Sequence, residues 1–279
     1  MGRARAPVVD AHLHIWDLER SEYAWLTPEL GPLYATFTAE QAQAELEAAG
    51  IVSAVLVQAE DSERDTELML EAAERHPWIA GVVGWVQLDD PAAAERQLER
   101  RHPRFSGVRH LVHDDPRDDF LLLPPVRRSL RLLADRGLPF DVPDAWPRHL
   151  AATADLAAAL PDLRIVVDHL GKPPYGTAGW DRWLDTLRDV AARPNTTAKV
   201  SGLQVPGTPF TVDEVRPAWE VALELFGPGG LIWGSDWPLT VPAGGCGRAW
   251  AVMSSLIAEL SPHEQVQILS ETARSAYKI

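Results

Sequence analysis

The chain has 279 residues, of which 46% are hydrophobic, and a formal net charge of −14 at pH 7. This length allows one large α/β barrel or two ordinary domains. The acidic balance argues against nucleic acid or an anionic membrane as a partner, because both bind basic surfaces, and favours a small-molecule substrate.

Short runs rich in valine and isoleucine recur about every thirty residues, as expected of buried parallel strands. In chain order, the predicted strands are 8–14, 52–58, 79–88, 105–112, 138–143, 163–169, 196–203 and 231–236. Segments with helical periodicity separate them, several of which begin at a proline or end at a glycine. The predicted helices are 39–49, 65–75, 91–102, 125–136, 148–159, 180–192, 213–226 and 248–260, with a terminal helix from Pro262.

Eight consecutive βα units without a Pro/Gly-rich hinge favour a single (β/α)8 TIM barrel, with residues 1–279 forming one domain. The chain lacks the glycine fingerprint of a dinucleotide-binding fold, which argues against an open doubly wound sheet. Two segments interrupt the regular spacing: a long loop over residues 17–38 after the first strand and another over 239–247 after the last. In a barrel, both lie at the C-terminal rim, where active sites are built.

Polar side chains occur where the predicted strands end. His12 and His14 are two residues apart, so they point the same way from one strand and offer two imidazoles to one cavity. The others are Arg109 and His110 on the fourth strand, Asp168 and His169 on the sixth, Lys199 and Ser201 on the seventh, and Asp236 on the eighth. A single residue of this kind often only caps a helix, but their repetition points to a shared site.

Five segments resemble the successive strand-end motifs of the amidohydrolase superfamily. They are residues 9–16 (VDAHLHIW), 107–110 (GVRH), 167–173 (VDHLGKP), 199–203 (KVSGL) and 234–238 (GSDWP). Together they are similar to the branch of TIM-barrel hydrolases that includes sugar lactonases of the L-fuconolactonase and L-rhamnonolactonase type. The resemblance implies a hydrolase of carbohydrate catabolism that opens a small lactone, in the first place a sugar aldonolactone, with an activated water.

The resemblance also implies roles for individual residues. Asp236 is expected to accept a proton from the attacking water, and His12, His14 and Asp236 to hold one divalent metal ion, with zinc as the expected identity. His169 is expected to complete that metal shell or to polarise the lactone carbonyl. The chain lacks the bridging lysine of two-metal relatives and a histidine on the fifth strand, so at most one ion is expected. A metal-free site, in which cationic side chains polarise the carbonyl, is the alternative.

Five residues are expected to contact the substrate. Arg109 and Lys172 are cations suited to a carboxylate, a lactone carbonyl or sugar hydroxyls, with salt bridges to nearby acids as the alternative. Trp16 and Trp25 could present flat faces to a sugar ring, and Lys199 is expected to meet a carbonyl or a hydroxyl. Four other histidines are expected to be solvated: His102, His113, His149 and His263.

Two other functions stay open at this point. A decarboxylase of the same superfamily would share the first-strand histidines and Asp236 but would release carbon dioxide; the missing fifth-strand histidine argues against it. A catalytically silent barrel would not require charged groups converging at its mouth.

The single cysteine, Cys246, cannot form a disulfide within the chain, which fits a reducing compartment. No stretch approaches the ~20 apolar residues of a membrane span, and no hydrophobic signal segment is apparent. We therefore expect a cytoplasmic protein without a membrane partner, and the sequence leaves monomer and homodimer open.

Overall fold

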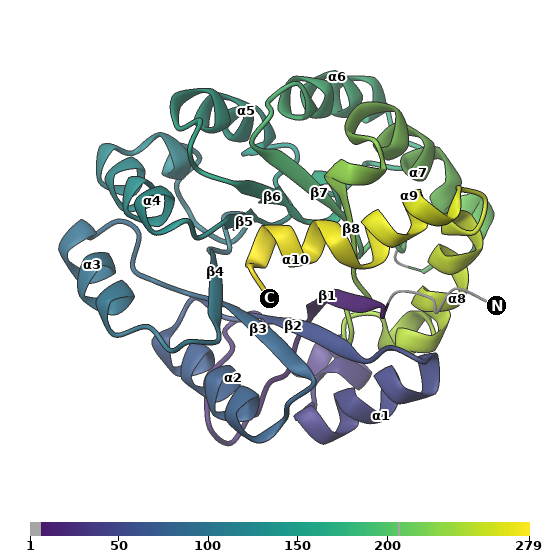
Figure 1. The fold of residues 1–279 in the computed structure, drawn as a ribbon, viewed down its shortest axis with the longest axis horizontal. Helices are drawn as coiled ribbons and strands as arrows, with labels where there is room; N and C mark the ends of the chain where they lie inside the picture. Colours follow the sequence, from purple (N-terminus) through teal and green to yellow (C-terminus); the bar gives the residue numbers. More distant parts are fainter. Residues whose placement is uncertain (1–6, 206) are drawn as a thin grey trace.

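The computed structural model describes residues 7–205 and 207–279, and these form the predicted (β/α)8 barrel. Eight parallel strands neighbour one another in chain order, and the helices surround them as an outer layer (Figure 1). The strands are β1 (Val9–Leu13), β2 (Ser53–Val57), β3 (Ile79–Gly84), β4 (Phe105–Arg109), β5 (Phe140–Val142), β6 (Ile165–Val167), β7 (Thr196–Val200) and β8 (Leu231–Trp233). The expected domain begins at residue 1, but residues 1–6 lie outside the described part.

The outer helices agree with the prediction to within a few residues. They are α1 (Ala39–Ala49), α2 (Glu63–Arg75), α3 (Pro91–Glu99), α4 (Pro124–Arg136), α5 (Leu150–Ala159), α6 (Trp180–Ala191), α7 (Val212–Phe226) and α8 (Gly245–Ile257). The terminal helix expected from Pro262 is confirmed but divided. A π-helical turn over Gln267–Glu271 joins α9 (Pro262–Val266) to α10 (Thr272–Tyr277).

Several strands end earlier than predicted. Those expected over 105–112, 163–169 and 196–203 end at Arg109, Val167 and Val200. The polar residues beyond these points turn away from the sheet. After β6, for example, Asp168–Gly171 forms a 3₁₀ turn in which His169 has a φ of 55°. The residues that carry the chemistry therefore lie largely on tight turns rather than within the ladder.

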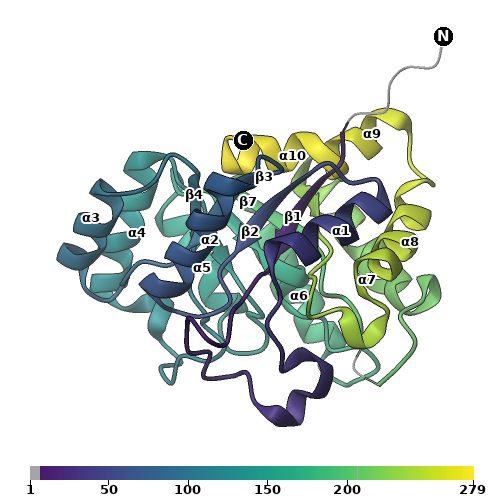
Figure 2. The ribbon, with the colours of Figure 1, turned by 90° about the horizontal axis from the view of Figure 1, so that it is seen from below.

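The barrel is closed at one end and open to the loops at the other. Small apolar side chains fill its interior, and Ala273, Ala276 and Tyr277 of α10 pack against them. The interior residues are Val9, Ala11, Val55, Val57, Val83, Val166 and Ile232. In Figure 2, α10 lies across one end and the loop after β1 projects from the opposite end. A site inside the barrel can therefore open only at the loop end.

A β-bulge in β1 sets the direction of the first histidine. Asp10 pairs with Ala54, whereas Leu13 pairs with Leu56, so β1 has one more residue than β2 over this interval. Ala11 packs with the interior cluster and Leu13 with the outer core. The extra residue lets His12 also point inward, as bulges beside active sites commonly do.

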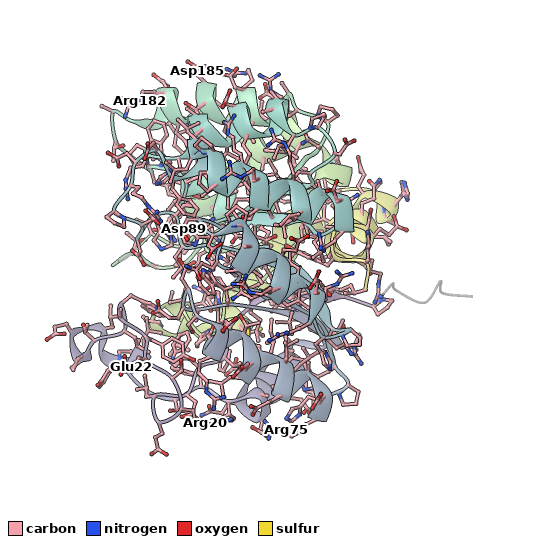
Figure 3. The ribbon with its side chains drawn as sticks, turned by 90° about the vertical axis from the view of Figure 1, so that its left-hand side faces the viewer. Arg20, Glu22, Arg75, Asp89, Arg182 and Asp185 are labelled. Atoms are coloured by element: carbon pink, nitrogen blue, oxygen red, sulfur yellow. The ribbon has the colours of Figure 1, made fainter. Side chains whose placement is uncertain are left out.

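The outer surface of the molecule is charged. Six exposed charged residues on its loops and helices are labelled in Figure 3: Arg20, Glu22, Arg75, Asp89, Arg182 and Asp185. Within the described residues, no helix combines the length and apolar character needed to cross a bilayer.

Candidate active site

A cavity of about 340 Å³ lies at the loop end of the barrel. Seven of the predicted site residues line it: His14, Trp16, Trp25, Arg109, His169, Lys172 and Asp236. Strand-end residues that are far apart in the sequence therefore lie together in one cavity. A larger hollow of about 740 Å³ between α2 and α3 contains none of the predicted site residues.

Three imidazoles surround one carboxylate oxygen on the floor of this cavity. Oδ1 of Asp236 lies 3.5 Å from Nε2 of His14, 3.6 Å from Nε2 of His12 and 3.9 Å from Nε2 of His169. The Nε2 atoms of His12 and His14 are 3.1 Å apart. All four residues are almost completely buried, and only His12 lies behind the cavity wall.

Hydrogen bonds on the far side of two rings fix their orientation. Nδ1 of His14 donates to the carbonyl oxygen of Val57 at 2.8 Å, which fixes the ring with its Nε2 toward Asp236. Nδ1 of His169 lies 3.0 Å from the hydroxyl of Ser201. Partners of this kind are typical of histidines that bind a metal or carry a proton.

The charges at this cluster are set by burial and by each other. Burial, and then the Lys199 ammonium, hold the pKa of His12 well below its usual range, and burial lowers the pKa of His169. Burial alone would raise the pKa of Asp236, but the surrounding imidazoles outweigh it and hold that pKa below its ordinary value. The site thus presents an ionised carboxylate beside two imidazoles, those of His12 and His169, whose burial favours their neutral form.

The donor set fits a divalent metal ion. Oδ1 of Asp236 is buried and has no hydrogen-bond partner among the described residues. One ligand atom each from His12, His14 and Asp236 lies within 4.8 Å of the others, and His12, Asp168 and His169 form a second group of the same kind. Nitrogen and carboxylate ligands in this number suit zinc and leave a position for water.

The structure places Lys199 beneath the cavity, which corrects the expected substrate contact. Its ammonium is fully buried and lies 2.7 Å from Oδ2 of Asp141, 3.0 Å from Oδ1 of Asp168 and 3.0 Å from Nδ1 of His12. A buried ammonium is tolerated only when paired, and here two carboxylates flank it. Lys199 therefore belongs to the support of His12 rather than to the cavity lining.

The two other cations lie at the cavity and are both paired. Nε of Arg109 donates to Asp168 at 2.9 Å and its Nη1 to the carbonyl of Gln58 at 2.8 Å, which leaves Nη2 without a partner among the described residues. Lys172 lies 3.8 Å from Asp144, with 41% of its side chain exposed. The salt bridges considered for both residues are thus present, and neither removes the cation from the cavity.

The long loop after β1 supplies an aromatic wall. Trp16 and Trp25 pack edge to face with their ring centres 5.4 Å apart. Each indole N–H is already satisfied, by the carbonyl of Ala35 for Trp16 and by that of Ala59 for Trp25. Their remaining surface is apolar, which suits contact with the carbon face of a ring.

The sequence pattern missed several cavity residues. Leu111, His113, Asp114, Asp144, Gln204 and Leu239 also line the cavity, all from loops whose course depends on packing. His113 was expected to be solvated, yet only 32% of its side chain is exposed, and His149 is completely buried. For Leu111 and His113, the only feature of the sequence that indicated a place at the cavity is their position just beyond β4.

Comparison with known proteins agrees with this geometry. The model of the amidohydrolase family matches residues 9–279. A curated L-fucono-1,5-lactonase from Burkholderia ambifaria is 32% identical over 277 residues, which cover 97% of this chain and 95% of that protein. A second L-fucono-1,5-lactonase, from Burkholderia multivorans, is 27% identical and covers 97% of this chain and 96% of its own.

A solved structure is similar over the whole chain. An amidohydrolase from Burkholderia multivorans, crystallised with bound zinc, has a TM-score of 0.89 and 27% identity, and covers 98% of this chain and 100% of its own. A 5-carboxyvanillate decarboxylase from Sphingomonas paucimobilis, at 16% identity and a TM-score of 0.68, shares the fold alone. The family model spans nearly all of the sequence, and the chain therefore belongs to the amidohydrolase family.

Proposed function

We propose that this chain is a lactonase that opens a small sugar lactone to its hydroxy acid by attack of a water molecule. The observation that carries the proposal is the unpaired, ionised carboxylate of Asp236 on the cavity floor, beside His14 and His169. Membership of the amidohydrolase family makes the chain a hydrolase. The two lactonase relatives support a lactone ester as the bond that is cleaved.

Asp236 is suited to take the proton of the attacking water. Its carboxylate is ionised, faces the cavity and has one oxygen free to accept. A divalent ion held by His12, His14 and Asp236 would lower the pKa of a water and polarise a carbonyl, and the zinc in the similar structure supports zinc for this role. His14 and His169 orient the carboxylate from either side.

Arg109 and His169 are the groups that we assign to the lactone carbonyl. The guanidinium is fixed by Asp168 and by the carbonyl of Gln58, so its unpaired Nη2 is held in one position at the cavity. A preorganised donor of this kind stabilises the negative charge that develops on a carbonyl oxygen under attack.

The cavity suits one small polyhydroxylated ring. Its volume of about 340 Å³ falls at the small end of ligand sites. The cavity lining combines the tryptophan wall with polar side chains, which include His113, Asp144 and Gln204. A sugar aldonolactone has matching apolar and hydroxylated faces, and its hydrolysis would place the enzyme in carbohydrate catabolism, in a reducing compartment such as the cytoplasm.

The test is a panel of neutral aldonolactones, incubated with the purified protein in weak buffer containing a pH indicator. Wild type should release acid from at least one of them, and Asp236→Asn should lower kcat by ~100- to 10,000-fold, because the proton acceptor is lost. Asp135→Asn removes the same charge from the exposed surface of α4 and serves as the matched control. Absence of hydrolysis by wild type, or near-normal turnover by the Asp236 variant, would refute the proposal.

No specific observation favours the decarboxylase alternative. The decarboxylases among the similar structures are 16% identical to this chain and share only the fold. On β5, Asp141 is the polar residue and is engaged by Lys199 and Tyr277. A binding-only barrel is not supported either, since the chain belongs to an enzyme family and retains the unpaired Asp236 carboxylate.

A further inference from the structure

One cavity residue, Asp144, has no part in the chemistry assigned above. It follows β5 with a φ of 41°, a backbone conformation that asparagine and aspartate tolerate better than other non-glycine residues. Its side chain is 29% exposed at the cavity, and Oδ1 has no hydrogen-bond partner among the described residues. A strained residue that lines a site is a candidate for a functional role.

Asp144 faces the cationic side of the cavity mouth. Its Oδ2 lies 3.8 Å from Nζ of Lys172. Burial alone would raise the pKa of Asp144, but Lys172 and then His169, His113 and Arg109 outweigh it and lower that pKa. The carboxylate is therefore ionised at neutral pH and opposes the ammonium.

The other charged side chains at the cavity do not make its mouth positively charged. Arg109 is already neutralised by Asp168 at 2.9 Å. A second carboxylate, Asp114, also lines the cavity and is 54% exposed. Lys172 is thus the one exposed cation among the described cavity residues, and Asp144 is its partner.

We propose that Asp144 determines the charge specificity of the site, by neutralising Lys172 and repelling substrate carboxylates, so that uncharged lactones are accepted and carboxylated lactones are rejected. This inference rests on the lactonase function proposed above. A substrate carboxylate that approached Lys172 would come close to Asp144, and like charges placed together at an interface exclude the wrong partner. Without Asp144, the same ammonium would attract that carboxylate.

The test compares two lactones that differ in one group. One is the neutral aldonolactone that wild type hydrolyses best; the other has a terminal carboxylate in place of its terminal CH₂OH or CH₃ group. Asp144→Asn keeps the shape and the tolerance of positive φ while removing the charge. We expect this variant to raise kcat/KM for the carboxylated lactone by about tenfold, mainly through KM, with little gain for the neutral one.

Two further variants isolate the cause. The double variant Asp144→Asn, Lys172→Gln should lose the gain, because the cation that attracts the substrate carboxylate is gone. Asp135→Asn on the exposed face of α4 changes the net charge equally and should leave the preference between the lactones unchanged.

A binding measurement separates this inference from the proposed function. Trp16 and Trp25 line the cavity, so their fluorescence should report binding of an aldarate dianion without any hydrolysis. The dianion should bind about tenfold more tightly to Asp144→Asn than to wild type. If wild type hydrolyses neutral lactones but Asp144→Asn changes neither the lactone preference nor dianion affinity, the inference fails and the lactonase stands. If wild type hydrolyses no lactone, the proposed function fails and this inference fails with it.

Discussion

Backbone strain is concentrated on individual residues around the cavity. Six described non-glycine residues have a positive φ, and four of them line the cavity: Asp144, His169, Lys172 and Asp236. Such conformations persist only where the surroundings enforce them. At this site, backbone hydrogen bonds hold two of these residues in place. The amide of Asp236 donates to the carbonyl of His12, and the amide of Lys172 donates to the carbonyl of His169.

Gly202 provides the space in which His169 and Asp236 meet. It has a φ of 58°, and an added Cβ would lie 2.7 Å from Cγ of His169 and 2.8 Å from Oδ2 of Asp236. Gly202→Ala should therefore push these two side chains apart and lower kcat/KM by at least about tenfold, because a small misplacement of reacting groups is costly. The measurement is kcat/KM on the best neutral lactone, together with the melting temperature.

Gly176→Ala is the matched control for that prediction. Gly176 has a similar φ of 64°, but nothing lies within 4 Å of its added Cβ. Both variants should lose about 1 kcal/mol or more of stability from backbone strain alone. Equal activities for the two alanine variants would mean that crowding at Gly202 does not matter.

The sequence predicted the site unevenly at the residue scale, for a physical reason. Four site residues could be predicted from the strand ends alone: His12, His14, His169 and Asp236. Parallel strands end at the same rim of a barrel, so residues at their ends lie close together whatever course the loops take. Lys199 was placed on the correct strand, but its ammonium pairs with one carboxylate on β5 and another directly after β6. Whether Lys199 contacts the substrate or forms salt bridges depends on distances in the folded chain, and a local sequence pattern does not contain them.

At the scale of elements, the loops after β1, β2 and β4 form one connected wall. Tyr23 of the long loop donates to Asp65 at 2.8 Å, and Trp25 donates to the carbonyl of Ala59 at 2.7 Å. Asp61, after β2, accepts from the amide of Leu111, after β4, at 3.0 Å. The sequence indicated that residues 17–38 would help to build the site, but contacts between loops could not be predicted from periodicity.

The contact between Asp61 and His110 joins two of these loops and should make stability depend on pH. Trp85 donates to Nδ1 of His110 at 3.3 Å, and Oδ2 of Asp61 lies 3.1 Å from the same nitrogen. Burial lowers the pKa of His110 to about 4, so the ring is neutral and its Nδ1 is an acceptor. Burial raises the pKa of Asp61 to about 7, and protonation of Asp61 removes the repulsion between its carboxylate and the lone pair of that nitrogen.

The sign of the effect follows from linkage. Asp61 has a higher pKa in the folded chain than in the unfolded one, so its contribution is fully present at low pH and is lost as the pH rises through about 7. From this group, wild type should lose ~1 kcal/mol of unfolding free energy between about pH 6 and about pH 8. Asp61→Asn, which carries no charge at any pH, should lack that loss.

Urea unfolding at both pH values measures this difference. Asp119→Asn is the control, because Asp119 is exposed on the segment before α4. If wild type and Asp61→Asn show the same pH dependence, the titration of Asp61 does not set the stability of this contact.

At the scale of the whole molecule, the site lies on the seam where the barrel closes. β8 ends at Trp233, and the hydrogen bonds to the β1 segment are made by the residues that follow β8. The amide of His14 donates to the carbonyl of Trp237 at 2.8 Å, and Oδ1 of Asp10 accepts from the amides of Ser235 and His12 at 2.9 and 3.1 Å. A buried side chain thus completes the junction between the first and last strands.

A buried polar chain also connects the closed end of the barrel to this seam. The hydroxyl of Tyr277 on α10 donates to Asp141 at 2.7 Å; Asp141 pairs with Lys199, whose ammonium lies 3.0 Å from His12. The sequence predicted a terminal helix but not this role, because the contact between Tyr277 and Asp141 spans 136 residues. The C-terminal helix therefore supports the metal-site candidate as well as closing the interior.

His12 lies on β1, His14 directly follows β1, and Asp236 follows β8. Because these candidate ligands come from the two sides of the seam, a divalent ion should hold the seam together. A ligand that binds only the folded chain stabilises it by mass action, by about 2.7 kcal/mol when its concentration is 100 times the Kd. Zinc added to chelator-treated protein should therefore raise the melting temperature in a concentration-dependent manner and bind at one ion per chain by elemental analysis. The rise should be much smaller for Asp236→Asn, which lacks the ligand charge, and unchanged for Asp135→Asn on α4. If zinc neither binds nor raises the melting temperature while lactone hydrolysis survives chelation, the metal-free alternative is correct, and Arg109 with the buried imidazoles must polarise the carbonyl unaided.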